Sequence, residues 1–198
     1  MYVYWIRHGQ SICNLTRRRG GWSLTPLSEE GHRQAAAAGE YLQAVPFDRI
    51  YSSDLPRCVQ TAQDALPGCQ PILDPRLREI HVGELTDLLA EECLERWGES
   101  YRQYMRDRDF TPYGGENMEQ HQQRVFDFIR NELETLEGAE HVAVFSHEGS
   151  IHKMLRYALE CDCPIQSAPN ANASAAVFAL RDGKWQLVQW NYTGGLVV

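Results

Sequence analysis

The chain has 198 residues, of which 43% are hydrophobic and 23% are charged, so residues 1–198 are expected to form one ordinary globular domain. The formal net charge of -8 argues against a general nucleic-acid binder, and no apolar run approaches the roughly 20 residues that a membrane-spanning helix needs. We therefore expect neither nucleic acid nor a membrane among its partners.

The cysteines indicate the redox environment. The chain starts without a basic stretch followed by an apolar one, so no secretory signal is expected. Six cysteines are scattered without a Cys-x-x-Cys pair, and Cys161-x-Cys163 lacks a second pair of soft ligands, which argues against a zinc site. The simplest interpretation is a cytoplasmic protein with reduced thiols.

The first candidate functional residues follow a short apolar run at residues 3–6. Because the run ends at Gly9, it predicts a buried strand that delivers Arg7 and His8 to the edge of a sheet, where open α/β folds bind ligands. An arginine fork suits phosphate, a histidine nitrogen can attack phosphorus, and a glycine lets the backbone pass close to a ligand. Taken alone, these residues could equally be a strand end with a surface arginine and a capping histidine.

Residues 10–22 predict a loop over the mouth of this site. Three arginines at 17–19 precede Gly20 and Gly21, and such a run either attracts an anion or is simply solvated. Asn14 could donate its amide to a phosphate oxygen, although a turn role fits it as well. Asn14 and the two glycines are therefore candidate substrate-binding residues.

Ser28 is predicted to cap a helix that runs to about Gln43, since Glu29 and Glu30 suit the positive end of the helix dipole. A short strand is expected at 48–53. These elements supply the alternation of strands and helices on which the fold prediction depends.

Arg57 lies in the first turn of a helix that should open at residues 55–62. A cation at that position opposes the helix dipole, so something should compensate it. A bound anion would do so, and so would a surface ion pair with Asp54. The local sequence leaves both interpretations open.

Glu79 follows a third predicted strand at 71–74 and lies beside apolar residues. It either points into the site or is a surface residue. Residues 86–113 then form a helical excursion that we expect to act as a lid. The helical spacing of its aromatic residues favours a role in packing over one as a substrate platform; these residues are Trp97, Tyr101 and Tyr104. Its arginines could hold a second anionic group of the substrate or be solvated; these are Arg96, Arg102, Arg106 and Arg108.

The second half of the chain predicts a turn at 113–117 and a long amphipathic helix. The apolar face of this helix consists of Val125, Phe128, Ile129, Leu133 and Leu136. Two strands at 175–180 and 185–190 end the chain, joined at Asp182-Gly183, a strong hairpin signal.

A clear strand at 141–146 ends at His147, Glu148 and Gly149, much as the first strand ends at His8 and Gly9. The next helix is expected from near Ser150 to near Glu160. His147 would then lie beside a helix N-terminus, which favours anions.

The alternating strands and helices predict a three-layer α/β/α fold with a mostly parallel central sheet and the small helical lid. In such a sheet the carboxyl ends of the strands share one edge, which gathers Arg7, His8, Arg57, Glu79 and His147. Two arginines and two histidines around one point form an anion cup, and a carboxylate beside it can act as a general acid.

This set resembles the histidine phosphatase superfamily, also called phosphoglycerate mutase-like, over almost the whole chain. The matching motifs, in the family's order, are Arg7-His8-Gly9 with Asn14, Ser52-Ser53-Asp54-Leu55 with Arg57 and Thr61-Ala62, Leu77-Arg78-Glu79-Ile80, Gly115-Glu116 and Ser146-His147.

The resemblance implies a metal-independent phosphatase that needs no cofactor and acts through a phosphohistidine. It implies that His8 is the nucleophile, with its other ring nitrogen bound to a backbone carbonyl, and that Glu79 is the general acid and base. The phosphoryl oxygens would be held by Arg7, Arg57 and His147. Further substrate contacts are expected from Asn14, Gly9, Glu148, Gly149, Gly20 and Gly21.

The chain also departs from the family pattern. Gln10-Ser11 replaces the commoner Glu-Thr, residues 83–87 lack the usual Trp-Glu-Gly, and residues 191–196 match the usual tail only loosely. Glu148 stands where glycine is usual, and it would repel phosphate unless it points away or pairs with an arginine or a substrate hydroxyl. These departures concern the substrate more than the chemistry.

The substrate is expected to be a small phosphorylated metabolite, and three functions remain open. The modest length of the lid favours hydrolysis over phosphoglycerate mutase-type transfer, because mutases of the family carry larger insertions. A protein that only binds a phosphate ligand is the third alternative. Trp185 and Trp190, expected to be uncovered on the last hairpin, could form the edge of a homodimer.

Overall fold

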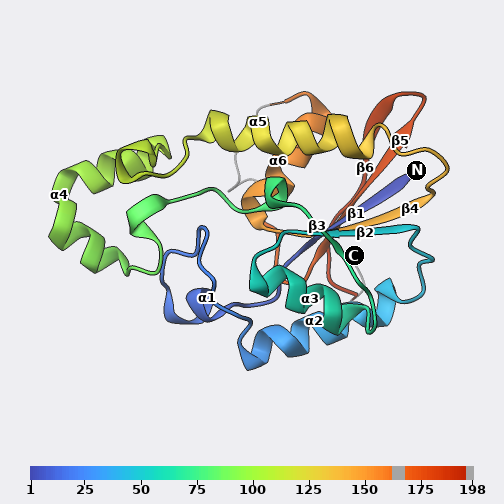
Figure 1. Cartoon of the computed structure of the whole chain (residues 1–198), viewed down its shortest axis with the longest axis horizontal. Helices are drawn as coiled ribbons and strands as arrows, with labels where there is room; N and C mark the ends of the chain where they lie inside the picture. Colours follow the sequence, from blue (N-terminus) through green and yellow to red (C-terminus); the bar gives the residue numbers. More distant parts are fainter. Residues whose placement is uncertain (162–167, 195–198) are drawn as a thin grey trace.

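The computed structural model describes residues 1–161 and 168–194 and has three layers, a sheet between two layers of helices (Figure 1). Within this part of the chain the sheet has six strands in the order β3-β2-β4-β1-β5-β6. The strands are β1 (Tyr2–Arg7), β2 (Arg49–Ser52), β3 (Ile72–Leu73), β4 (His141–Ser146), β5 (Ala175–Arg181) and β6 (Lys184–Tyr192). The first four strands run parallel, while β5 pairs antiparallel with β1 and with β6. The predicted mostly parallel α/β fold is confirmed.

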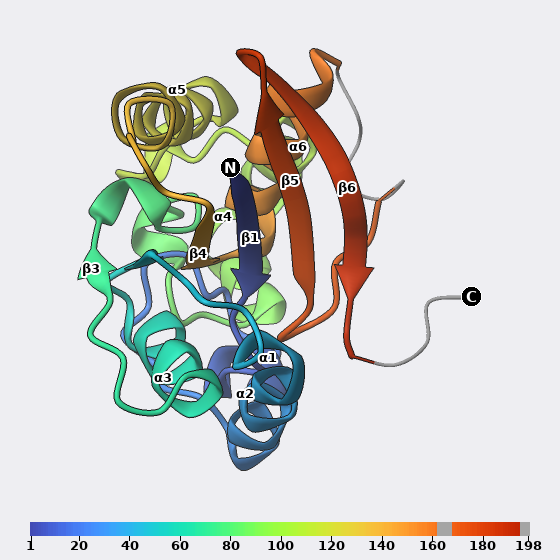
Figure 2. The ribbon, with the colours of Figure 1, turned by 90° about the vertical axis from the view of Figure 1, so that its right-hand side faces the viewer.

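Helices cover both faces of the sheet (Figure 2). The helices that flank the sheet are α2 (Glu29–Leu42) and α3 (Pro56–Ala65) on one face, and α5 (Met118–Phe128) and α6 (Glu148–Leu159) on the other. Side chains of a strand alternate between its two faces. In β1, Val3 and Trp5 therefore pack against α5 and α6, whereas Ile6 packs against α2 and α3.

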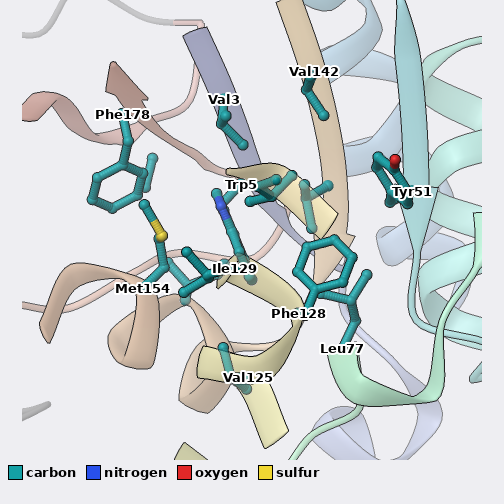
Figure 3. Packing of buried hydrophobic residues seen from close by; sticks show 14 of the residues in the cluster. Val3, Trp5, Tyr51, Leu77, Val125, Phe128, Ile129, Val142, Met154 and Phe178 are labelled. Atoms are coloured by element: carbon teal, nitrogen blue, oxygen red, sulfur yellow. The ribbon is translucent and has the colours of Figure 1, made fainter. Parts of the chain in front are cut away.

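The larger hydrophobic cluster lies beneath α5 and α6 (Figure 3). Its aromatic centre is Trp5, whose ring meets that of Phe128 edge to face at 6.1 Å between centroids. Phe128 ends α5, and a π-helical turn over Ile129–Leu133 continues it. The single long helix predicted here is thus two helical segments, and its apolar residues Val125, Phe128, Ile129 and Leu133 are all buried.

Helix boundaries depend on capping residues. Ser28 accepts a hydrogen bond from the backbone N–H of Gly31 and begins α2 as predicted. α6 begins at Glu148, not near Ser150, because the backbone of His147 is still extended and serves as its N-cap. A short helix that the sequence analysis missed, α1 (Ile12–Thr16), lies in the predicted loop, where Ser11 and Asn14 form a capping box.

The excursion after Glu79 has a hydrophobic core of its own. It contains a 3-10 turn (Gly83–Leu85), α4 (Ala90–Asp107) and a second 3-10 turn (Thr111–Tyr113), and α4 lies far from the sheet in Figure 1. Tyr101 is buried, and the rings of Trp97 and Tyr104 meet Tyr113 edge to face at 5.0 and 5.3 Å between centroids. The aromatic stripe is therefore packing, as expected.

The last hairpin turns at Asp182 and Gly183, which both have positive φ, as a two-residue hairpin turn requires. The prediction that Trp185 and Trp190 are uncovered is wrong. Both are partly buried against the cluster beneath α5 and α6, because their indole N–H groups bind Glu134 and the carbonyl of Pro169.

Other expectations concern thiols and membranes. Cys13, Cys58, Cys69, Cys93 and Cys161 are free thiols, whereas Cys163 and the end of the tail lie outside the described residues. In residues 1–161 and 168–194 we find no helix with the length and apolar character to cross a membrane.

Candidate active site

The two predicted histidines meet at the carboxyl edge of the sheet. β1 and β4 are parallel neighbours in which Arg7 pairs with Ser146, so the residues that follow each strand leave the sheet side by side. The ring centroids of His8 and His147 are 5.1 Å apart, with an interplanar angle of 64°. Residues 139 positions apart in the sequence thus form one cluster, as the sequence analysis required.

His8 is held as a neutral imidazole. Its Nδ1 lies 2.7 Å from the carbonyl oxygen of Gly9, and its Nε2 accepts a hydrogen bond of 3.3 Å from Nε of Arg57. These partners place the proton on Nδ1 and the lone pair on Nε2, where it accepts the hydrogen bond from Arg57. Burial, together with the charges of Arg57 and Arg7, holds the pKa of His8 well below its usual value. The bond to a backbone carbonyl is the one that the family resemblance implied.

Gly9 has a packing role in this structure. A Cβ atom there would lie 2.4 Å from the carbonyl oxygen of Gly31, so only glycine allows the loop to approach α2 this closely. Its backbone N–H donates to the hydroxyl of Thr61. The carbonyl of His8 in turn accepts from the amide of Asn172. The backbone of His8 is fixed on both sides.

Arg57 is buried, and of the two interpretations left open by the sequence the surface ion pair with Asp54 is not the one formed. Its two terminal nitrogens donate to the carbonyl oxygens of Ser23 and Gly21 at 2.9 and 2.8 Å. Asp54 instead binds Arg78 through both carboxylate oxygens. The loop after α1 therefore provides the compensation that the start of α3 required, because its carbonyl dipoles face the guanidinium.

His147 is fully buried, and both of its ring nitrogens form hydrogen bonds with other side chains of the protein. Nδ1 accepts from Nη2 of Arg57 at 3.1 Å, and Nε2 lies 2.9 Å from the hydroxyl of Ser53. Burial, followed by the charge of Arg57, holds its pKa well below the usual value. In this arrangement His147 orients Arg57, and its direct contact with a phosphoryl oxygen stays a prediction.

Glu79 lies at the N-terminus of α6. One carboxylate oxygen accepts from the backbone N–H of Ile80 at 2.9 Å and the other from that of Gly149 at 3.1 Å. A Cβ atom on Gly149 would lie 2.1 Å from the nearer oxygen of Glu79, so glycine is required for this approach. Gly149 thus positions the candidate acid, and the positive end of the helix dipole faces that carboxylate.

Two residues that the sequence analysis did not single out hold the backbone of Glu79. The indole N–H of Trp22 donates to its carbonyl at 2.7 Å, and Arg124 donates to the same oxygen at 3.2 Å. Arg124 also binds both carboxylate oxygens of Glu116, which explains the Gly115-Glu116 motif. Glu116 belongs to a motif that the sequence analysis named, and a carboxylate in such a motif needs a basic partner. A search for that partner could have identified Arg124.

Arg7 and Glu148 form an ion pair. Nη2 of Arg7 lies 3.2 Å from Oε2 of Glu148, and Nη1 donates to the backbone oxygen of Asn170. Nε of Arg7 is buried and has no hydrogen-bond partner among residues 1–161 and 168–194. Pairing with an arginine was one of the conditions under which Glu148 would not repel phosphate, and the structure meets it.

A cavity of about 620 Å³ lies beside Glu79, between the loop after α1 and the lid. Its polar lining consists of Arg19, Gly20, Glu79, Arg106, Arg108 and Glu148. Arg19 also binds the hydroxyl of Tyr101 on the lid. Of the predicted loop residues, Arg19 and Gly20 line this cavity, whereas Gly21 accepts a hydrogen bond from Arg57 through its carbonyl oxygen.

Asn14 is the predicted site residue with the weakest connection to this cluster. Its side-chain oxygen accepts from the backbone N–H and the hydroxyl of Ser11, both at the start of α1. The turn role considered for it is therefore present, and its contact with phosphate stays a prediction. Within the described ranges, no group of three or more His, Cys, Asp or Glu side chains is arranged to hold a metal ion.

Comparison with known proteins shows which sequences this chain resembles. The family model described as the histidine phosphatase superfamily (branch 1) matches residues 3–193. A 2,3-bisphosphoglycerate-dependent phosphoglycerate mutase 2 of Gloeobacter violaceus is 35% identical, over 76% of this chain and 72% of that protein. A 2,3-bisphosphoglycerate-dependent phosphoglycerate mutase of Brucella melitensis is 33% identical, over 81% of this chain and 82% of that protein.

Solved structures show the same fold. A mycobacterial glucosyl-3-phosphoglycerate phosphatase in complex with VO3 superimposes with a TM-score of 0.82 at 27% identity, over 96% of this chain and 98% of that one. An alpha-ribazole phosphatase of Shigella flexneri superimposes with a TM-score of 0.89 at 24% identity, over 100% of both chains.

Proposed function

This chain belongs to the histidine phosphatase superfamily, and from that premise we propose that it is a metal-independent phosphomonoester hydrolase whose nucleophile is Nε2 of His8. One observation carries the proposal: His8 is buried and neutral, with Nδ1 bound to the carbonyl of Gly9 and the Nε2 lone pair turned toward Arg57. A neutral imidazole with a fixed tautomer and two cations beside it suits attack on phosphorus.

In the first step, Nε2 of His8 forms a bond to phosphorus while the bond from phosphorus to the alcohol oxygen breaks. Glu79 gives its proton to the departing oxygen. Arg7 and Arg57 neutralise the phosphoryl oxygens, and His147 orients Arg57. The carbonyl of Gly9 stabilises the positive charge that the imidazole acquires.

In the second step, the carboxylate of Glu79 takes a proton from a water molecule, and the water oxygen attacks the phosphohistidine. The N–P bond breaks, inorganic phosphate leaves, and His8 returns to its neutral form. The cations of the protein supply the charge that a metal ion supplies in other phosphatases.

Hydrolysis is favoured over transfer between substrates by the likeness to the mycobacterial phosphatase at 27% identity over nearly the whole of both chains, and by the modest lid at 86–113. Mutase activity is the second candidate, because the 35% identical relative carries that name. A time course with 3-phosphoglycerate and 2,3-bisphosphoglycerate separates them. A hydrolase releases inorganic phosphate, however slowly, and forms no 2-phosphoglycerate, whereas a mutase forms 2-phosphoglycerate without net release of phosphate.

The nucleophile is tested by His8→Ala with p-nitrophenyl phosphate. We expect no turnover above background, and loss of the acid-labile phosphoryl label that the unchanged protein acquires when it is quenched during turnover. His32→Ala is the matched control, since His32 is an exposed histidine of α2 paired with Asp64. Full activity of the His8 variant, or a label that persists in it, contradicts the assignment.

A further inference from the structure

Glu148 lies at the junction of the phosphate-binding residues and the cavity. It is the first residue of α6, directly after His147, and its side chain is 34% exposed. One carboxylate oxygen faces Arg7, while the side chain also lines the cavity that contains Glu79. Arg7 is the only ion-pair partner recorded for Glu148 in residues 1–161 and 168–194, so its carboxylate retains acceptor capacity toward the cavity.

The alcohol part of the substrate must enter this cavity, because Glu79 protonates the departing oxygen there. Two carboxylates, Glu79 and Glu148, therefore border the first carbons of the leaving alcohol. A carboxylate or second phosphate on those carbons would face Glu148 and be repelled, whereas a hydroxyl would donate a charge-assisted hydrogen bond to it.

The cationic side chains of the cavity come from other elements. Arg19 belongs to the loop after α1, and Arg106 and Arg108 belong to the lid. Selection by Glu148 thus concerns the groups of the substrate that approach its carboxylate, whereas an anionic group that contacts one of these arginines would be stabilised.

We propose that Glu148 selects against phosphate esters whose alcohol part carries a carboxylate or a second phosphate within two carbons of the ester carbon, and favours those that carry only hydroxyl groups there. The substrate class is therefore that of polyol and sugar phosphates. This inference rests on the proposed hydrolase function. It also separates this chain from its phosphoglycerate mutase relatives, whose named substrate is a carboxylate.

Glycerol 3-phosphate and 3-phosphoglycerate test the proposal, since they differ only in a CH2OH group against a carboxylate. The readout is the ratio of their kcat/KM values. Any effect of Glu148 on phosphate binding through Arg7 cancels in that ratio, because the phosphoryl group is the same. We expect the unchanged protein to prefer glycerol 3-phosphate, and Glu148→Gln to reduce the preference at least about tenfold.

Glu137→Gln is the matched control, with the same change of charge at an exposed residue just before the N-terminal end of β4. It should leave the ratio unchanged. Turnover of p-nitrophenyl phosphate by Glu148→Gln shows that the variant is folded. A ratio that Glu148→Gln leaves unchanged, or an unchanged protein that prefers 3-phosphoglycerate, overturns the inference.

A failure of the hydrolase function is recognised separately, because the unchanged protein would then release phosphate from none of the three esters. In that case calorimetry measures the dissociation constants of glycerol 3-phosphate and 3-phosphoglycerate. The ratio of the two constants is compared between the unchanged protein and Glu148→Gln. The preference for glycerol 3-phosphate must still fall in the variant. Equal preferences in the two proteins contradict the role of Glu148 whatever the reaction is.

Discussion

At the scale of single residues, the site depends on where protons and charges lie. His8 and His147 are neutral because burial and nearby guanidinium groups disfavour a further positive charge. Glu79 is the carboxylate that can exchange a proton with the leaving alcohol, and two backbone N–H groups fix its position. A single substitution can thus remove one chemical role and leave the phosphate-binding residues in place.

Glu79→Gln keeps the size of the side chain and one of its two backbone hydrogen bonds, because an amide oxygen accepts and an amide nitrogen does not. The variant cannot donate or take the catalytic proton. We expect turnover of an alkyl phosphate such as glycerol 3-phosphate to fall by about 10²–10⁴-fold. Turnover of p-nitrophenyl phosphate should fall much less in the phosphorylation step, because nitrophenolate leaves without protonation. The measurement is single-turnover phosphorylation with both esters, and equal losses would count against the acid role.

At the scale of elements, the loop after α1 connects the arginine and the acid. Gly21 and Ser23 offer their carbonyls to Arg57, and Trp22 between them donates to the carbonyl of Glu79. The Trp22 ring also lies 4.3 Å from that of His81, measured between centroids. One short segment therefore sets the position of Arg57 relative to Glu79, the proposed phosphate-binding group and proton donor.

Trp22→Phe removes the indole N–H and keeps most of the ring stacking. We expect turnover of glycerol 3-phosphate to fall about three- to tenfold, with a smaller loss for p-nitrophenyl phosphate, because only the first ester needs a well-placed acid. Trp190→Phe is the control, since it also removes an indole hydrogen bond to a backbone carbonyl, on β6. The same fractional loss for both esters would indicate a general structural defect instead.

At the scale of the whole molecule, several histidines are buried without charge. Burial lowers the pKa of His8, His121 and His147 well below the usual value and that of His152 to about 4. The unfolded chain takes up protons on these histidines near pH 6.5, where the folded protein does not. Their contribution to stability is therefore complete above about pH 6.5 and is lost as the pH falls toward the folded-state pKa values.

We expect the free energy of unfolding to decrease between pH 7.5 and pH 5, by up to about 1.4 kcal/mol per pH unit for each such histidine below pH 6.5. Urea unfolding at a series of pH values measures it. His121→Gln removes one of the titrating groups, so the decrease should be smaller in that variant. A free energy of unfolding that stays constant or rises on acidification is the contrary result.

The sequence alone determined the frame of the site. The short apolar runs before Arg7-His8 and before His147 identify buried strands, and alternation with helices makes those strands parallel, so their ends share an edge. Local patterns place His8 and Glu79 at the ends of predicted elements, because strand ends, caps and turns depend on neighbouring residues. Their proposed roles as nucleophile and acid come from the family resemblance of the motifs.

Only the tertiary structure decided which groups form hydrogen bonds and ion pairs with the charged side chains of the site. Arg57 binds the carbonyls of Gly21 and Ser23 and not Asp54, and Glu148 pairs with Arg7. These partners lie far apart in the sequence, and backbone carbonyls are present at every residue, so no periodicity or spacing marks the ones that are used. The fold brings them within hydrogen-bonding distance, and that proximity turns a set of motifs into a site with a defined proton and charge arrangement.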